Sequence, residues 1–168
     1  QLVAVLGGII MAESAIYPSL RDRVVFVSGG ASGIGAAIVE QFCLQGAKVS
    51  FVDIDADAAA SLADDIAARD LPRPRFLPCD LKDVEALQYT IGQVITADGP
   101  ITALINNAAN DERHTIDDVT PAYFDDRIAV NLRHQFFATQ AVHGPMAEAG
   151  GGAIVNIGSV TWLIGQGG

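Results

Sequence analysis

Short apolar runs alternate with longer segments of helical periodicity along most of the chain. Residues Val24–Ser28 read VVFVS, an uninterrupted apolar run of the kind expected for a strand that is covered on both faces. The other strands are predicted at Lys48–Asp53 and residues 75–79, 101–105 and 152–157, and the helices at residues 33–46, 56–69, 84–98 and 121–145. Strands that alternate with helices through short connections predict an α/β fold, a doubly wound parallel sheet with helices on both faces.

Prolines and polar residues mark the ends of these elements. Pro78 cannot donate a hydrogen bond to a neighbouring strand, so the third strand is predicted to lie near an edge of the sheet. Asp55 is placed to cap the second helix, and Thr120 followed by Pro121 predicts the start of the last one. That helix is predicted to run to Gly144-Pro145 or slightly beyond. Its apolar stripe consists of Phe124, Ile128, Leu132 and Phe136.

Composition narrows the classes of function. The chain has 168 residues, of which 50% are hydrophobic, and its formal net charge is −10. The apolar content excludes a disordered chain, and an acidic surface is repelled by phosphate backbones, so nucleic acid is not an expected partner. Cys43 and Cys79 are too few for a disulfide scaffold and lie in apolar stretches, as reduced thiols in a cytosol would. We expect a cytoplasmic protein without a metal site.

The first residues stand apart from this pattern. Residues 1–10 read QLVAVLGGII, which lacks the basic leading region and cleavage site of a signal peptide and is too short to span a bilayer. Since no other run approaches a membrane span, no membrane association is expected. We interpret Met11 as the natural start, residues 1–20 as an N-terminal extension of which 1–10 are not native, and residues 21–168 as one dinucleotide-binding domain.

A glycine-rich segment, SGGASGIG, joins the first strand to the first helix at residues 28–35. Glycine permits the dihedral angles of such a turn and lets a pyrophosphate approach bare N–H groups at a helix N-terminus. Asp53 ends the next strand, where a carboxylate can accept both hydroxyl groups of an adenosine ribose and repel a 2′-phosphate. Ser32 offers that phosphate no positive charge. The segment therefore predicts a site that prefers NAD to NADP.

The glycine segment resembles the T-G-x-x-x-G-I-G motif of the short-chain dehydrogenase/reductase family, with Ser28 in the place of the threonine. Further motifs of that family follow in order: Cys79-Asp80-Leu81, Asn106-Asn107-Ala108-Ala109 with Ala109 in the place of a glycine, Val130-Asn131-Leu132, and Val155-Asn156-Ile157-Gly158-Ser159. The resemblance covers residues 21–168, the N-terminal two-thirds of the family's Rossmann-type fold. It assigns to the cofactor Gly29, Ser32, Gly33, Ile34, Gly35, Asp53, Ile54, Asp80, Leu81, Asn107, Ala108 and Ala109.

The resemblance also implies a chemistry. In this family a tyrosine phenolate takes the proton of the substrate hydroxyl while hydride passes to the nicotinamide, and a lysine four residues later lowers the pKa of that tyrosine. A serine orients the substrate oxygen and an asparagine holds a water molecule in a proton relay; the matching residues are Ser159 and Asn131. The tyrosine and lysine are expected beyond Gly168. The fold is therefore expected to be truncated before the helix that carries them. The next helix, which usually packs against the helix of the apolar stripe at a dimer interface, is expected there too.

Three local segments narrow the resemblance to bacterial NAD-dependent aldose dehydrogenases of this family, which oxidise the anomeric hydroxyl of a pyranose such as xylose or galactose to the lactone. These segments are residues 109–114 (ANDERH), 131–134 (NLRH) and 158–162 (GSVTW). Asn110 and His114 are placed to hydrogen-bond sugar hydroxyls, and Trp162 to stack on a sugar face. His134 and His143 are interpreted as surface or packing residues.

We therefore expect an NAD-dependent dehydrogenase of a small sugar or other secondary alcohol, assembled as a homodimer or homotetramer. Two alternatives stay open. One is the same machinery run in reverse, an NAD(P)H-dependent carbonyl or 3-oxoacyl reductase, which Asp53 disfavours because reductive members more often use NADPH. The other is a non-catalytic fragment that binds the nucleotide without turnover. A Tyr-x-x-x-Lys in the downstream reading frame distinguishes an enzyme from such a fragment.

Overall fold

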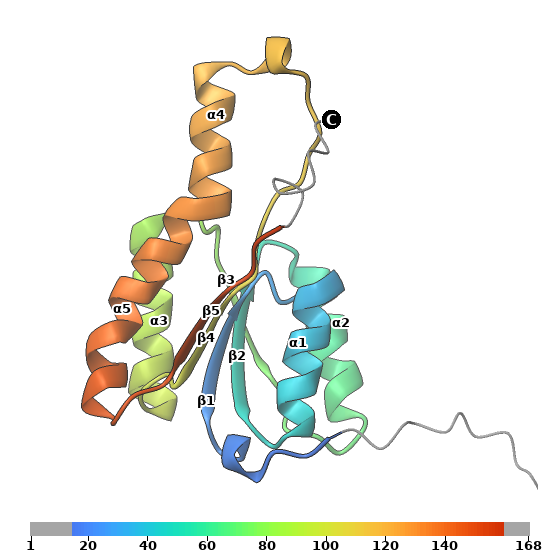
Figure 1. Ribbon diagram of the computed structural model, residues 1–168. Helices are drawn as coiled ribbons and strands as arrows, with labels where there is room; N and C mark the ends of the chain where they lie inside the picture. The colour runs from blue at the N-terminus through green and yellow to red at the C-terminus, as the bar shows by residue number, and fades with distance from the viewer. Residues whose placement is uncertain (1–14, 160–168) are drawn as a thin grey trace, which may run out of the picture.

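Five parallel strands form one sheet in the computed structural model, which describes residues 15–159 (Figure 1). The strands are β1 (Val24–Ser28), β2 (Lys48–Asp53), β3 (Arg75–Pro78), β4 (Ala103–Asn106) and β5 (Ala153–Asn156). Their order across the sheet is β3-β2-β1-β4-β5, and every neighbouring pair is parallel. The predicted parallel α/β sheet is confirmed, as is the position of β3 at an edge.

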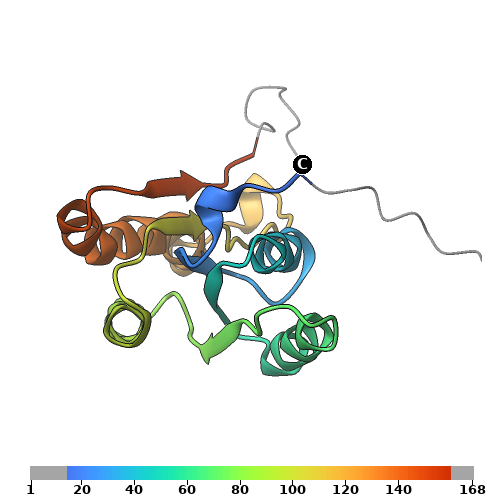
Figure 2. The same ribbon diagram turned by 90° about the horizontal axis from the view of Figure 1, so that it is seen from below.

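Helices cover both faces of this sheet, as a Rossmann-type fold requires. α1 (Gly33–Leu44) and α2 (Ala56–Ala67) lie on one face, and α3 (Val84–Asp98) and α5 (His134–Glu148) lie on the other (Figure 2). Side chains of β1 alternate between the two faces, so Val25 packs in the core under α1 and α2 while Phe26 packs in the core under α3 and α5. Both are completely buried, which explains the uninterrupted apolar run of β1.

Side-chain oxygens cap the N-termini of three helices. Asp55 accepts a hydrogen bond from the Ala58 N–H at 3.0 Å, and Thr120 accepts one from the Tyr123 N–H at 3.1 Å. Both caps were expected from the sequence, because a cap depends only on residues within one helical turn. Asp83 caps α3 in the same way.

The last predicted helix contains an irregular turn. It begins as α4 (Pro121–Ile128), passes through a π-helical turn, η3 (Ala129–Arg133), and continues as α5 through Pro145 to Glu148. The apolar stripe on this helix is exposed: Phe124, Leu132 and Phe136 retain 56%, 58% and 65% of their accessible surface. It therefore adds nothing to the core of the described residues.

The buried side of this helix includes His134, whose side chain is completely enclosed. Burial lowers the pKa of His134 and outweighs the opposing effect of the Val130 backbone, so the enclosed position favours the neutral imidazole. His143 is exposed. Both histidines have the packing or surface positions expected of them.

Both cysteines are free and buried. Burial, together with the nearby Glu40 carboxylate, raises the pKa of Cys43 to about 12. Burial is also the main cause of the raised pKa of Cys79. Within residues 15–159 no helix has the length and apolarity needed to cross a membrane.

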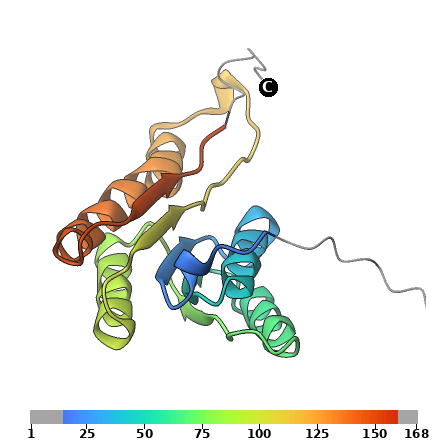
Figure 3. The ribbon, with the colours of Figure 1, turned by 60° about the horizontal axis from the view of Figure 1, so that its bottom comes forward.

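The segment between β4 and α4 rises from the carboxyl end of the sheet and returns toward it along α4 (Figure 3). It carries the sequence ANDERH and a single turn of 3-10 helix, Ile116–Asp118. This projection forms one side of the region where the strand ends meet.

Candidate active site

A cleft of about 440 Å³ opens at the carboxyl ends of the strands. Residues that follow β1, β2, β3 and β4 all contribute to its wall. β1 and β4 are neighbours whose connecting helices lie on opposite faces of the sheet, and the crevice at such a point is the usual ligand site of an open parallel sheet. Every residue predicted to bind the cofactor except Gly33 lines the cleft, and so does Asn110.

The glycine segment is tightly packed on one side and open on the other. A Cβ atom at Gly35 would lie 1.8 Å from the carbonyl oxygen of Gly29, so a side chain fits here only if the turn moves. Gly33 has a φ of +54° and no atom within 4 Å of the place where its Cβ would be. The space above Gly33 is therefore open at the point where α1 begins.

The first turn of α1 has backbone N–H groups that can donate hydrogen bonds to a ligand. Its N-cap, Ser32, makes no side-chain capping bond to the helix that follows. The first N–H groups of a helix have no partner within the helix, and they carry the positive end of its dipole. A phosphate or pyrophosphate group fits this combination of open space and free N–H groups.

Asp53 is fixed at the rim of the cleft by three backbone hydrogen bonds. Its Oδ2 accepts from the Ala31 N–H at 2.9 Å, and its Oδ1 accepts from the N–H groups of Ile54 and Asp55 at 2.8 and 3.1 Å. A carboxylate oxygen has more than one lone pair, so these bonds orient the group without exhausting its capacity to accept others. The arrangement is suited to a ligand with adjacent hydroxyl groups.

Ser28 joins the ends of the two central strands. Its hydroxyl oxygen accepts hydrogen bonds from the backbone N–H groups of Asn107 and Ala108, at 3.1 and 3.2 Å. In return, the Asn107 amide donates to the carbonyl oxygens of Ser28 and Gly29, at 3.2 and 2.9 Å. The Ser28 hydroxyl and the Asn107 side-chain amide together hold the turn after β4 against the glycine segment.

We expect Ser28→Ala to lower the free energy of unfolding by about 1–3 kcal/mol, because two N–H groups of the turn lose their acceptor. Ser28→Thr keeps the hydroxyl and is expected to cost less. Urea denaturation followed by circular dichroism measures both. An alanine variant as stable as the wild type would show that the hydroxyl does not stabilise the contact between the turn after β4 and the glycine segment.

Asn131 lies in the π-helical turn and binds the loop after β4. Its Oδ1 accepts from the Asn110 N–H at 2.7 Å, and its Nδ2 donates to the Asn110 carbonyl at 3.1 Å. The carbonyl oxygen of Asn131 accepts from the side-chain amide of Gln135 at 2.9 Å. The structure therefore brings together two of the residues singled out in the sequence, Asn131 and Asn110.

Ser159 lies three residues beyond the end of β5 and is exposed. β5 itself is held to β4 by a hydrogen bond of 2.8 Å from Asn106 Nδ2 to Asn156 Oδ1. Trp162 lies outside the described residues, so its predicted contact with substrate stays a prediction.

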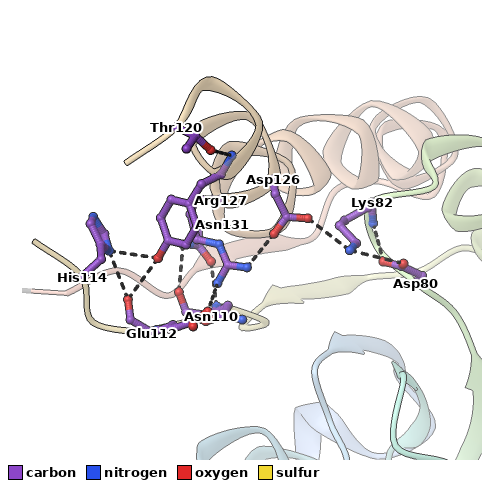
Figure 4. A network of polar contacts seen from close by, with 10 residues as sticks. Asp80, Lys82, Asn110, Glu112, His114, Thr120, Asp126, Arg127 and Asn131 are labelled. Atoms are coloured by element: carbon purple, nitrogen blue, oxygen red, sulfur yellow. Dashed lines mark hydrogen bonds and ion pairs between the residues drawn. The ribbon is translucent and has the colours of Figure 1, made fainter. Parts of the chain in front are cut away.

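His114 is exposed and stands against α4 instead of lining the cleft. Its Nδ1 is 2.9 Å from the hydroxyl oxygen of Tyr123, and the two rings meet edge to face (Figure 4). The structure thus pairs His114 with a tyrosine that sequence reasoning did not assign to the site.

A row of charged residues in the wall of the cleft was also missed. Lys82 Nζ is 3.2 Å from Asp126 and 3.9 Å from Asp80, and Arg127 Nη2 donates to Asp126 at 2.5 Å. Hydrogen bonds from Arg127, and secondarily from Lys82, hold the pKa of Asp126 below its usual range. The remaining unpredicted wall residues are Cys79 and Val130. One signal was available: Arg127 precedes Asn131 by one helical turn and so shares its face.

Three or more His, Cys, Asp or Glu side chains arranged to hold a metal ion do not occur within residues 15–159. What the cleft offers instead is glycine backbone, one oriented carboxylate and several amide groups. These groups suit a dinucleotide and a hydroxylated substrate.

Comparison with known proteins agrees with this geometry. The profile of the short chain dehydrogenase family matches residues 23–167. The chain belongs to this family. Two relatives of the chain are a D-xylose 1-dehydrogenase of Caulobacter vibrioides and a probable galactose dehydrogenase of Rhizobium meliloti, each 45% identical, over 153 and 151 residues. The resemblance to aldose dehydrogenases is thereby confirmed.

Solved structures of the family share its fold. A short-chain dehydrogenase/reductase from Serratia marcescens superposes with a TM-score of 0.79 at 32% identity, over 86% of this chain and 58% of that one. A metagenomic short-chain oxidoreductase in complex with NADP gives 0.78 at 30% identity, over 84% and 64%. The two sugar dehydrogenases are covered to 60% and 59% of their lengths, by 91% and 90% of this chain. The chain thus spans about 60% of the length of those two relatives.

Proposed function

We propose that the protein oxidises the anomeric C1 hydroxyl of an aldopyranose to the lactone, with NAD as the hydride acceptor. The observation that carries the proposal is the 45% identity to a D-xylose 1-dehydrogenase and to a probable galactose dehydrogenase over about nine-tenths of the chain. The cleft supports it, because it combines a place for a dinucleotide with a polar loop beside it.

NAD fits the residues that are present. Free N–H groups at the start of α1 suit its pyrophosphate, Asp53 suits the hydroxyls of its adenosine ribose, and Asp80 and Leu81, which line the same cleft, are proposed to flank its adenine. Asn107, Ala108 and Ala109 line the next part of the same cleft. The Asp53 carboxylate would repel the 2′-phosphate of NADP. A similar fold does bind NADP in the metagenomic enzyme, so the preference rests on this side chain and not on the fold.

The chain's own residues would orient the substrate and move its proton. Ser159 is proposed to hydrogen-bond the substrate oxygen, and Asn131 to hold a water molecule in the proton relay. The proton itself is assigned to the family's tyrosine, activated by a lysine four residues later, a pair that does not occur in residues 1–168. The proposal therefore concerns the complete gene product. Assembly as a homodimer or homotetramer is part of it, since the exposed stripe on α4 and α5 would otherwise leave apolar surface in water.

The test compares sugars that differ only at the reacting position. With the complete gene product, D-xylose and D-galactose are expected to reduce NAD faster than NADP, as followed by NADH absorbance. Methyl β-D-xyloside is the matched control, because its anomeric oxygen is methylated and cannot be oxidised to a lactone. Equal oxidation of the methyl glycoside, or faster reduction of 3-oxoacyl substrates with NADPH, would overturn the proposal. NADH binding without any turnover would favour the non-catalytic alternative.

A further inference from the structure

The loop after β4 lies along one face of the helix that follows it. Three helix residues spaced four apart share that face, and each contacts the loop (Figure 4). The pairs are Asn131 with Asn110, Arg127 with Glu112, and Tyr123 with His114. The loop therefore runs antiparallel to the helix, with every second loop residue facing it.

The spacing of these contacts follows from backbone dimensions. Two residues of fully extended chain would span roughly 6.6 Å, close to the roughly 6 Å of four α-helical residues, so contacts at every second loop residue and every fourth helix residue can stay in step. The intervening side chains, Asp111 and Arg113, pair with each other at 3.1 Å. Segment 110–114 is thus held on the helix in one register.

Arg127 occupies the middle of this contact. Its side chain is only 20% exposed, its guanidinium lies 5.0 Å from the centre of the Tyr123 ring, and its Nη1 is 3.5 Å from Glu112 Oε2. Nε and Nη1 are shielded from water and make no hydrogen bond to any residue within 15–159. Donors enclosed in this way favour the approach of a carboxylate, and Glu112 supplies one from the loop.

Tyr123 fixes the orientation of the His114 ring. Its hydroxyl is 2.9 Å from Nδ1 of His114 and 3.4 Å from the Glu112 carbonyl oxygen. Whichever of the two groups donates, Nδ1 is engaged by the tyrosine hydroxyl, so Nε2 is the nitrogen of this ring that is left to bind another hydroxyl group.

We propose that Tyr123 and Arg127 are positioning residues that hold segment 110–114 in register on α4, and so determine which sugar hydroxyls Asn110 recognises at the wall of the cleft. The inference rests on the proposed function. Asn110 and Arg127 both line the cleft, so a loop that slips along the helix changes the wall that the substrate meets.

The test uses Tyr123→Phe and Arg127→Met in the complete gene product. Arg69→Met is the matched control, because Arg69, in the turn after α2, also pairs with a glutamate, Glu40 of α1 at 2.6 Å, and neither residue lines the cleft. Both test variants are expected to speed hydrogen exchange of the amides in segment 110–114, and the control is not. They are expected to lower kcat/KM for the preferred aldose about five- to tenfold, mainly through KM, and to change the ratio between D-xylose and D-galactose; Tyr123→Phe, which lies outside the cleft wall, is expected to leave NADH affinity unaltered.

A second set of variants distinguishes a positioning role from a general loss of stability. Glu112→Gln is expected to reproduce part of the effect of Arg127→Met, and the double variant to be no worse than Arg127→Met alone, because the two residues act as one pair. Exchange rates in segment 110–114 that match the wild type in both test variants would overturn the inference, whatever the enzyme oxidises. Faster exchange with unchanged sugar preference would overturn it too. A wild-type protein inactive on every aldose would instead refute the proposed function, and the exchange rates would still decide the register.

Discussion

Asp53→Asn is expected to weaken NADH binding by about ten- to a hundredfold and to bring NADPH affinity close to that of NADH. The carboxylate is held at the cleft rim by three backbone N–H groups, so its charge faces the place of the adenosine ribose in a fixed orientation. A hydrogen bond to a charged acceptor contributes about 1.5–3 kcal/mol, which corresponds to the expected loss. The amide also removes the repulsion of a 2′-phosphate.

Fluorescence titration with both reduced cofactors measures this change. Asp57→Asn is the matched control, because Asp57 is an aspartate in the first turn of α2, four residues further along the chain. Thermal unfolding without cofactor shows how much of the effect is structural, since the side-chain amide introduced at position 53 would place an NH₂ group against one of the N–H donors. Unchanged selectivity between NADH and NADPH, in a variant that still folds, would remove Asp53 as the basis of the proposed preference for NAD.

Features determined by neighbouring residues could be predicted from the sequence. The uninterrupted run of β1, the Asp55 and Thr120 caps and the edge position given by Pro78 depend on residues within one turn or one strand. The wall of the cleft was also largely predicted, because parallel strands bring their carboxyl ends together wherever they lie in the sequence. The chemical roles of those residues stay predictions.

Features that arise from packing between distant segments were missed. The ion pair between Lys82 and Asp126 joins residues far apart in the sequence, so no local sequence pattern predicts it. The π-helical turn around Asn131 adds a residue to one turn without interrupting the apolar pattern of the helix. The apolar stripe itself was visible, but its spacing shows only that one face is apolar and does not show that this face is exposed.

Two glycines of the glycine segment allow an effect on folding to be distinguished from an effect on cofactor binding. Gly35→Ala is expected to lower the free energy of unfolding by about 3 kcal/mol, because its Cβ would lie 1.8 Å from the Gly29 carbonyl oxygen and the turn must move to admit it. Gly33→Ala meets no atom within 4 Å, and costs only about 1–2 kcal/mol for an alanine at a φ of +54°. Its methyl group nevertheless fills the open space at the start of α1.

Gly33→Ala is therefore expected to fold but to bind NADH about tenfold more weakly, as expected when a hydrogen bond between backbone and phosphate is lost. Gly92→Ala is the control for the substitution itself: it lies within α3 with no neighbour within 4 Å, and is expected to stabilise the protein by about 0.5–1 kcal/mol. Urea denaturation and NADH titration of the three variants give the comparison. If Gly33→Ala binds NADH as the wild type does, the pyrophosphate does not approach the start of α1. If Gly35→Ala is as stable as the wild type, the turn can yield, and the close contact with Gly29 is not what requires a glycine at position 35.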